Sequence, residues 1–136
     1  MQINPNKIIK KGYIKLSEWS RIQYIGIDLT ADNNYEILPE QPRALIRLSE
    51  EFNLPKNIFA ILYPRSTMFR MGFIIQCGVI EPGYKGRPVI LIYCPNIKKK
   101  ITILKGVRLV QAIFYKARSR GLYKGQYQNE GLKINN

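Results

Sequence analysis

The sequence has no histidine among its 136 residues, only nine acidic side chains and only two cysteines. The lack of histidine excludes Ser-His and Cys-His nucleophile pairs and every zinc site that needs imidazole. Cys77 and Cys94 are too few for a disulfide scaffold or a four-cysteine metal site, so we expect two buried thiols in a reducing compartment. Acid–base chemistry is left to carboxylates, tyrosines or lysines.

Long hydrophobic runs are also missing. The first twenty residues, MQINPNKIIKKGYIKLSEWS, contain no apolar stretch of the length that a signal peptide or a membrane span requires. We therefore expect a soluble, cytoplasmic protein with no membrane partner. With 46% hydrophobic and 23% charged residues, the chain has the composition of a folded globule, and its length fits one domain.

Negative charge is scarce, and the formal net charge is +13. Residues 97–136 carry ten basic side chains and one acidic one, whereas residues 28–51 carry six acidic and two basic ones. Such an excess suits a polyanionic partner. The sequence contains no RNP-type aromatic pattern and no helix-turn-helix spacing, so we expect no specific nucleic-acid partner. We interpret the run Lys98–Lys100 as a solvated loop tip.

Short runs of β-branched and aromatic residues, separated by turn signals, predict an all-β fold of the antiparallel sandwich or barrel type. One short helical turn is expected at Thr67–Met71. We predict one domain over residues 1–117, followed by a polar, glycine-containing flexible arm over residues 118–136. The predicted strands are Ile25–Leu29, Ala44–Leu48, Ile58–Tyr63, Phe73–Val79, Pro88–Tyr93, Ile101–Leu104 and Arg108–Tyr115.

Two segments have the composition of a ligand site. Tyr63–Thr67 (YPRST) follows an apolar strand and combines a guanidinium with two hydroxyls, which suits a phosphate clamp. The alternative is a capped turn with a surface arginine. Gln76–Gly86 predicts a hairpin whose Pro-Gly turn holds Glu81 and Tyr84 on its inner curve, with glycines that let a ligand approach the backbone. The alternative is an ordinary turn with an exposed glutamate.

Two further segments carry polar groups on apolar strands. Gly26–Leu29 (GIDL) contains Asp28, an awkward charge unless it has a partner or faces water. Gly106–Gln111 (GVRLVQ) places Arg108 and Gln111 around one strand start, where either residue is equally compatible with a plain surface position.

Together, in this order and at these separations, the four segments resemble the trimeric dUTPase and dCTP deaminase superfamily. Its motifs run approximately as GxDL, PRS[S/G], GVIDxxYxG and GxRxxQ, and the resemblance spans roughly residues 25–114. It implies a distorted β jelly roll, a homotrimer with active sites between subunits, and nucleotide phosphates held through Mg²⁺.

The resemblance also implies roles for individual positions. Glu81 takes the place of the family's aspartate, which activates the water that attacks the α-phosphate, and Asp28 holds the metal through water. The implied substrate contacts are Arg65, Ser66, Thr67, Arg70 and Gln111 at the phosphates, Gly78, Val79 and Ile80 at the pyrimidine edge, Tyr84 at the deoxyribose, and Tyr123, Lys124 and Tyr127 in the arm.

The two branches of the superfamily differ at one decisive position. Residues 65–72 and 123–130 resemble the deaminase versions RSSLARLG and YxGKYQxQ, but Leu91 stands where deaminases carry a proton-shuttling glutamate. A leucine cannot move a proton. We therefore predict a dUTP pyrophosphatase that forms dUMP and pyrophosphate. The alternatives are a dCTP deaminase-like enzyme and a catalytically weak nucleotide-binding trimer with a regulatory role, since Glu81 adds a methylene and the glycine-rich arm motif RGxGGFGS is absent.

Overall fold

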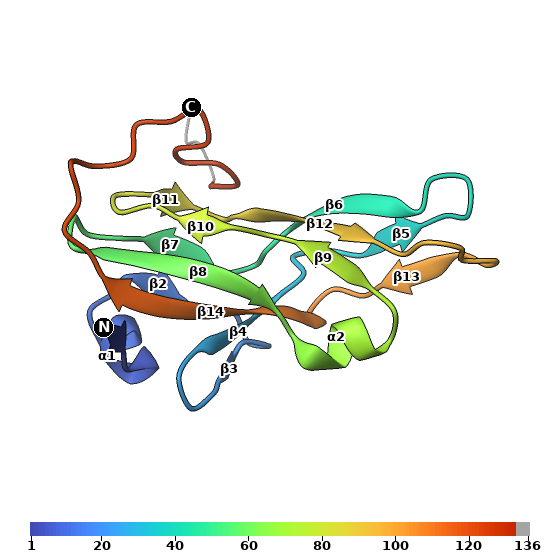
Figure 1. The fold of residues 1–136 in the computed structure, drawn as a ribbon, viewed down its shortest axis with the longest axis horizontal. Coiled ribbons are helices and arrows are strands. Elements are labelled where there is room, and N and C mark those ends of the chain that lie inside the picture. Colours follow the sequence, from blue (N-terminus) through green and yellow to red (C-terminus); the bar gives the residue numbers. More distant parts are fainter. Residues whose placement is uncertain (133–136) are drawn as a thin grey trace.

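The computed structural model describes residues 1–132, and they form a β protein with two short helices, α1 (Pro5–Lys10) and α2 (Ser66–Arg70) (Figure 1). The strands are β1 (Gln2–Ile3), β2 (Ile14–Lys15), β3 (Arg21–Ile22), β4 (Ile27–Thr30), β5 (Tyr35–Ile37), β6 (Arg43–Arg47), β7 (Glu51–Asn53), β8 (Ile58–Pro64), β9 (Ile74–Gln76), β10 (Val79–Ile80), β11 (Lys85–Gly86), β12 (Val89–Tyr93), β13 (Ile101–Ile103) and β14 (Arg108–Lys116).

The strands pair antiparallel in four small sheets. The largest has the order β10-β8-β14-β4-β3, with β1 added to β14; the others are β11-β7-β2, β6-β12-β9 and β13-β5. The longest pairing joins β14 to β8 over seven residues, from Val110 opposite Pro64 to Lys116 opposite Ile58. This arrangement confirms the predicted all-β, distorted jelly-roll fold.

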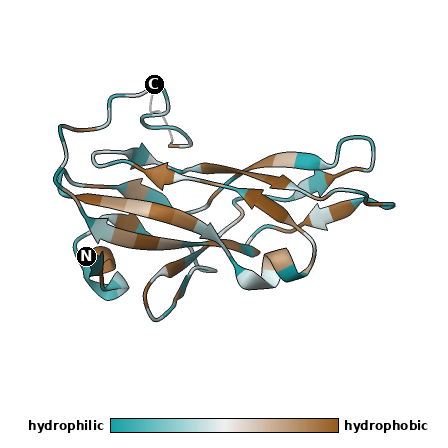
Figure 2. Ribbon diagram, viewed as in Figure 1, coloured by the Kyte–Doolittle hydropathy of each residue, from teal (hydrophilic) through white to brown (hydrophobic). Residues whose placement is uncertain are grey.

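Alternating burial explains why the longest runs become strands. In β8, Ile58, Ala60 and Leu62 are buried, while the residues between them face outward. Apolar residues follow the strands in the same way across the molecule, and polar ones gather in the loops and the arm (Figure 2). Phe52 and Phe114 pack against each other in the core, where their rings stack with centroids 5.9 Å apart.

The predicted strand Phe73–Val79 is wrong as one element. The chain changes sheets at Cys77–Gly78: Gln76 of β9 pairs with Leu91 of β12, whereas Val79 of β10 pairs with Ile61 of β8. The predicted closed hairpin over 76–86 is wrong for a similar reason, since β10 and β11 belong to different sheets. The Pro-Gly turn that the sequence predicts within this segment is present.

Helix α1 was not expected. Asn4 caps it by accepting a hydrogen bond from the Asn6 backbone N–H, and Pro5 occupies its first turn. Its six residues bury only Pro5 and Ile8, too few to produce a helical period in the sequence. Within residues 1–132, no helix is long and apolar enough to cross a membrane. The cytoplasmic location stays a prediction.

Candidate functional site

Asp28 lies almost fully buried in β4, at 1% exposure, opposite Gln111 of β14 and Arg21 of β3. Gly26, just before the strand, allows β4 to approach β14 this closely. A Cβ at position 26 would lie 2.5 Å from the Ala112 carbonyl oxygen, which no side chain tolerates. Gly26 therefore allows the close spacing of β4 and β14 at which Asp28 is buried.

The Asp28 carboxylate has four side-chain partners, which together with it form what we call the Asp28 cluster. Oδ2 accepts from Gln23 Nε2 at 2.7 Å and lies 3.0 Å from Arg108 Nη1 and 3.2 Å from Arg65 Nε; Oδ1 lies 3.5 Å from Gln111 Nε2. Two guanidinium groups thus neutralise one buried carboxylate, which leaves the cluster one positive charge in excess.

Backbone geometry brings the two arginines to Asp28. Strand β8 ends at Pro64, after which the Arg65 N–H donates to the Leu109 carbonyl. A register shift between Arg108 and Val110 interrupts the β14–β4 ladder, and such bulges redirect side chains. Arg65 Nη1 also donates to the Arg108 carbonyl oxygen at 3.2 Å, so the two residues hold each other in place.

A cavity of about 340 Å³ opens over this cluster. Its walls are mainly polar and include Arg65, Ser66 and Gln111 of the predicted phosphate site. The lining residues are Gln23, Asp28, Tyr63, Pro64, Arg65, Ser66 and Gln111. An open pocket with excess positive charge and hydroxyl and amide donors suits a phosphate-bearing ligand.

These residues do not suit a resident metal ion. Within residues 1–132 no group of three or more acidic or cysteine side chains forms a possible metal cage. Asp28 is the one carboxylate at this cavity, and four donors already surround it. Divalent cations need several oxygen ligands, and the carboxylate at this cavity is already paired with two arginines, so these residues alone do not form a Mg²⁺ site.

The segment 78–86, from here on the β10–β11 loop, forms the second part of the site. The Tyr84 N–H donates to the Glu81 carbonyl at 3.1 Å, which closes the turn that the sequence predicts. Gly83 lies in the left-handed region with φ +84°, and a Cβ there would lie 2.8 Å from Leu122 Cβ. Glu81 is exposed at the end of β10, an outer strand of its sheet whose second edge is open to a ligand.

Tyr84 is buried at 5% exposure in the same loop. Its ring packs edge-on against Phe52 and Tyr123, with centroids 6.4 and 5.7 Å away, and its hydroxyl donates to Glu130 Oε1 at 2.7 Å. Burial, and then the hydrogen bond to Glu130, raise the pKa of Tyr84 well above its ordinary value. The phenol therefore stays neutral and acts as a donor.

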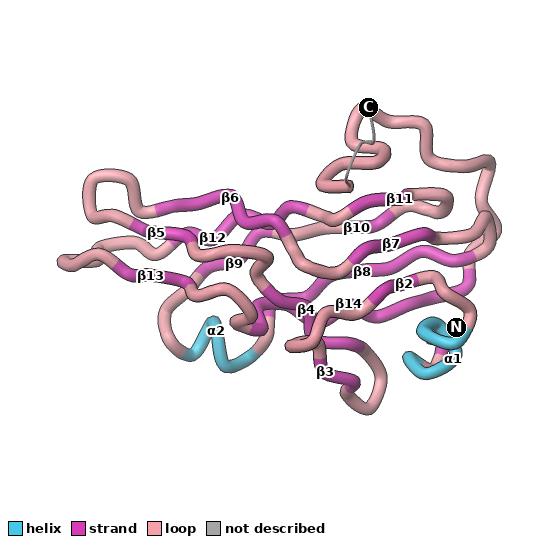
Figure 3. The backbone as a smooth tube through the Cα atoms, turned by 180° about the vertical axis from the view of Figure 1, so that it is seen from behind, coloured by secondary structure: helices cyan, strands magenta, loops and turns pink. Residues whose placement is uncertain are grey.

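The described part of the arm, residues 118–132, folds back onto the β10–β11 loop of its own chain (Figures 1 and 3). Polar contacts hold it: the Tyr123 N–H donates to the Pro82 carbonyl at 2.8 Å, and Gln128 Nε2 donates to the Gly83 carbonyl at 2.9 Å. Glu130 adds a 3.7 Å ion pair with Arg47. The predicted flexibility of the arm stays a prediction, but a docking position for it exists.

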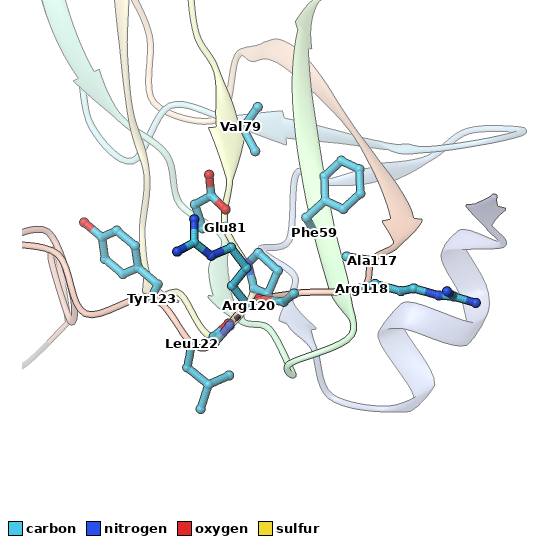
Figure 4. A pocket seen from close by; sticks show the side chains of 11 residues that line it. Phe59, Val79, Glu81, Ala117, Arg118, Arg120, Leu122 and Tyr123 are labelled. Atoms are coloured by element: carbon cyan, nitrogen blue, oxygen red, sulfur yellow. Dashed lines mark hydrogen bonds between the residues drawn. The ribbon is translucent and has the colours of Figure 1, made fainter.

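Two cavities lie between loop and arm. The smaller has a volume of about 180 Å³ and is bordered by the residues predicted to contact the pyrimidine and the sugar, together with three residues of the arm. Its lining residues are Leu62, Gly78, Val79, Ile80, Glu81, Tyr84, Pro88, Val89, Tyr123, Tyr127 and Glu130. The larger, about 690 Å³, has the apolar walls Phe59, Val79 and Leu122 and receives Glu81, Arg118 and Arg120 (Figure 4). Arg120 extends toward the side of the cavity where Glu81 projects.

The structure therefore gathers most of the predicted residues into two groups. Thr67, Arg70 and Lys124 line none of the three cavities just described. Sequence reasoning missed Gln23, Arg108 and Glu130 as site residues. Arg108 lies in the segment 106–111 and Glu130 in the deaminase-like segment 123–130, whereas Gln23 precedes every motif; nothing in the sequence indicates the partner of Gln23 or of Glu130.

The two groups lie at opposite ends of β8. Ile80, next to Glu81, pairs with Ala60 near the start of β8, and Arg65 follows its last residue. Glu81 shares one cavity with Phe59 and another with Leu62, which lie six and three residues before Arg65, or roughly 20 and 10 Å of strand. In the single chain the two groups therefore line separate cavities along β8.

A family described as dCTP deaminase-like matches residues 34–117, more than half of the chain, and includes β8, the β10–β11 loop and Gln111. The chain belongs to this family. The match confirms the resemblance to the dUTPase and dCTP deaminase superfamily that the four segments indicated.

Within the dCTP deaminase-like family, two kinds of relative are similar to this chain. A deoxyuridine 5′-triphosphate nucleotidohydrolase of Methanocaldococcus jannaschii is 32% identical over 90% of this chain and 78% of its own length. A probable enzyme of the same name from Methanococcoides burtonii is 36% identical over 64% and 52%. A dCTP deaminase of Pyrobaculum islandicum is 29% identical over 69% and 53%. The alignments thus span about half to four fifths of the curated relatives.

Solved structures of the family share the fold. The dUTPase of Staphylococcus bacteriophage 80alpha superposes with a TM-score of 0.64, covering 83% of this chain and 95% of its own at 20% identity. The dCTP deaminase of Agrobacterium tumefaciens superposes equally well, with a TM-score of 0.64 over 83% and 46% at 17% identity. Because dUTPases and dCTP deaminases share this fold, only the residues of the site can indicate which of the two reactions is catalysed.

Proposed function

We propose that this protein hydrolyses dUTP to dUMP and pyrophosphate as a homotrimer, with each active site shared between subunits. The observation that carries the proposal is that two complementary groups, a cationic pocket and a loop with an exposed carboxylate, line separate cavities of one chain. A second copy that places its β10–β11 loop over the Asp28 cluster brings them together.

Exposed apolar residues support self-assembly. The outer face of the β6-β12-β9 sheet places Leu91 beside Leu45, and Tyr93 beside Ile74. Leu45 is 67% and Ile74 54% exposed on the single chain. Neighbouring apolar side chains of this kind are favoured positions for a protein contact, and the incomplete site supplies a reason for the partner to be another copy.

In the proposed reaction, Glu81 accepts a proton from water as the water oxygen bonds to the α-phosphorus. The bond from that phosphorus to the bridging oxygen breaks, and pyrophosphate leaves. Arg65, Ser66 and Gln111 stabilise negative charge on the phosphates through charge-assisted hydrogen bonds. The substrate would be the Mg²⁺ complex of dUTP, in which the metal ion would offset part of the triphosphate charge.

The remaining residues select the nucleoside. The open edge of β10, at Gly78, Val79 and Ile80, offers backbone groups to the pyrimidine edge, and Tyr84 lies where a 2′-hydroxyl would meet a ring without a hydrogen-bond partner. Tyr123 and Tyr127 of the arm cover the same cavity. Arg70, Thr67 and Lys124 line none of these cavities, so their predicted contact with substrate would require assembly or arm movement.

The test is a substrate panel. Purified protein is incubated with dUTP, dCTP, dTTP or UTP, each with and without Mg²⁺, and pyrophosphate and nucleotide products are measured. We expect pyrophosphate and dUMP from dUTP in the presence of Mg²⁺. Release no greater than that of a Glu81→Gln variant refutes the proposal. Tight dUTP binding without turnover supports the regulatory trimer instead.

The family name makes dCTP deamination the second candidate. It predicts a uracil nucleotide from dCTP. Leu91, which occupies the deaminase glutamate position, lies on the outer face of β12 between Leu45 and Gln76. Neither neighbour supplies a carboxylate, so we expect no uracil product.

Shared sites have their own test. Arg65→Gln and Glu81→Gln variants damage different halves of the site. If each site draws one half from each of two subunits, co-expression of the two inactive variants restores part of the dUTP hydrolysis. If both halves act within one subunit, mixing restores nothing.

A further inference from the structure

The Asp28 carboxylate is better placed to organise guanidinium groups than to reach a metal. It is 1% exposed, and Gln23, Arg65 and Arg108 all contact Oδ2 within 3.2 Å while Gln111 lies 3.5 Å from Oδ1. A carboxylate offers about four lone-pair positions. Three of the four contacts are made to Oδ2, so protein donors, chiefly the two guanidinium groups, set the position of that oxygen.

The two arginines contact Asp28 through different atoms, and this determines which of their N–H groups remain for the cavity. Arg108 contacts Asp28 through Nη1 but does not line the 340 Å³ cavity, so it offsets the charge of the carboxylate without being part of the cavity wall. Arg65 contacts Asp28 through Nε and the Arg108 carbonyl through Nη1. A guanidinium has five N–H donors, so Arg65 keeps three for the cavity that it lines.

We propose that Asp28 is a positioning residue that, with Arg108, presents Arg65 as an anion receptor able to bind pyrophosphate without a divalent metal. The receptor has its positive charge and its orientation already in place, because Asp28 and Arg108 lie on β4 and β14, and Arg65 directly follows β8 and donates to the Leu109 carbonyl. This inference rests on the proposed assignment of the cavity to phosphate groups. It differs from the expected role of Asp28 at Mg²⁺.

Calorimetric titration of the full-length protein with inorganic pyrophosphate, once in EDTA and once in Mg²⁺, tests the proposal. We expect binding in EDTA. We expect Asp28→Asn to weaken that binding about tenfold or more, by releasing both guanidinium groups, and to leave the ratio of affinities with and without Mg²⁺ unchanged. Glu36→Gln is the matched control, since it removes a carboxylate that is paired with Lys100 at 3.3 Å but lies away from this cavity.

Three results overturn the proposal. The wild-type protein fails to bind pyrophosphate in EDTA; Asp28→Asn keeps its EDTA affinity and loses only the gain from Mg²⁺, as a metal-contacting residue would; or Asp28→Asn binds more tightly, which makes Asp28 a mere counter-charge. If Asp28→Asn does not fold, Arg108→Lys keeps the charge but not the fork geometry, and it is expected to show the same loss. The assay does not depend on dUTP turnover, so failure of the proposed reaction is seen separately.

Discussion

The Asp28 cluster and the β10–β11 loop are built in different ways. In the cluster, charged side chains lie on or next to strands of the largest sheet and pair with one another, with a carboxylate at 1% exposure held by two arginines. In the loop, Glu81 is exposed, and one wall of its cavity comes from the arm. Residues that bind a ligand are thus held in fixed positions by a rigid sheet. The carboxylate proposed to react lies instead where closure of the arm can control its exposure to water.

The largest effect should come from Glu81→Gln. Within residues 1–132 the Glu81 side chain makes no ion pair, and the structure assigns it no hydrogen bond, so its loss leaves the fold intact. Removal of a general base lowers kcat by about 10²–10⁴-fold. Steady-state kinetics with dUTP should show this fall with an unchanged melting temperature. A kcat within twofold of wild type would show that another group takes the proton.

Unlike Glu81→Gln, the Arg65→Gln substitution should lower the stability of the fold as well as weaken substrate binding. It takes one guanidinium from a buried carboxylate, and breaking such a pair costs about 3 kcal/mol when no compensation follows. Thermal melting and KM for dUTP measure the two effects. We expect a clear fall in melting temperature together with a raised KM. An unchanged melting temperature would mean that Arg108 and Gln23 alone satisfy Asp28.

Deletion of residues 119–136 should reduce kcat by about tenfold or more and leave assembly intact. The reason is that the arm supplies walls of both loop cavities but no strand of the sheets among the described residues. Size-exclusion chromatography with light scattering gives the assembly state. Full activity would show that the arm is dispensable, and loss of the trimer would show that it is structural.

Tyr84→Ala should narrow the preference for dUTP over UTP. A 2′-hydroxyl buried against the ring costs roughly 1–3 kcal/mol, so the wild-type preference should be at least about tenfold. Competition kinetics with the two nucleotides give the ratio. Because Tyr84 also packs against Phe52, the melting temperature is needed as a control. A variant with undiminished discrimination would assign the ring to core packing alone.

The smallest effect concerns alkaline pH. The pKa of Tyr84 is raised from its ordinary 10.0 in the folded protein, so the folded state holds a proton that the unfolded state loses first. Its contribution to stability is therefore complete below about pH 10 and declines as the pH rises above that value. Melting curves between pH 8 and 11 should show the decline, with a weaker slope for Tyr84→Phe. Equal slopes would assign the decline to other groups.

The sequence predicts the fold class and the identity of the two half-sites because each depends on local patterns. Alternation in Ile58–Tyr63 gives β8, and Pro82-Gly83 gives the turn beside Glu81. It does not predict the change of sheet at Cys77–Gly78, since both flanking pieces are equally apolar and only their partners, β12 and β8, distinguish them.

The sequence also predicts Asp28 and Arg65 as site residues without predicting their contact. The four donors around Asp28 come from three separate regions of the chain, near residues 23, 65 and 108–111. No spacing in the sequence encodes such a meeting, which results from the register of β4, β14 and β8. Docking of Glu130 on Tyr84 likewise depends on a fold-back across forty-six residues.

The position of β14 has a consequence for biosynthesis. It is the last of the described strands to leave the ribosome, yet it lies between β8 and β4 and also pairs with β1. Until residues 108–116 emerge, the nascent chain carries partner strands whose backbone edges have nothing to pair with. Assembly of the largest sheet must therefore wait until residues 108–116 have been synthesised, and a stalled chain that ends before Arg108 is a natural client for chaperones.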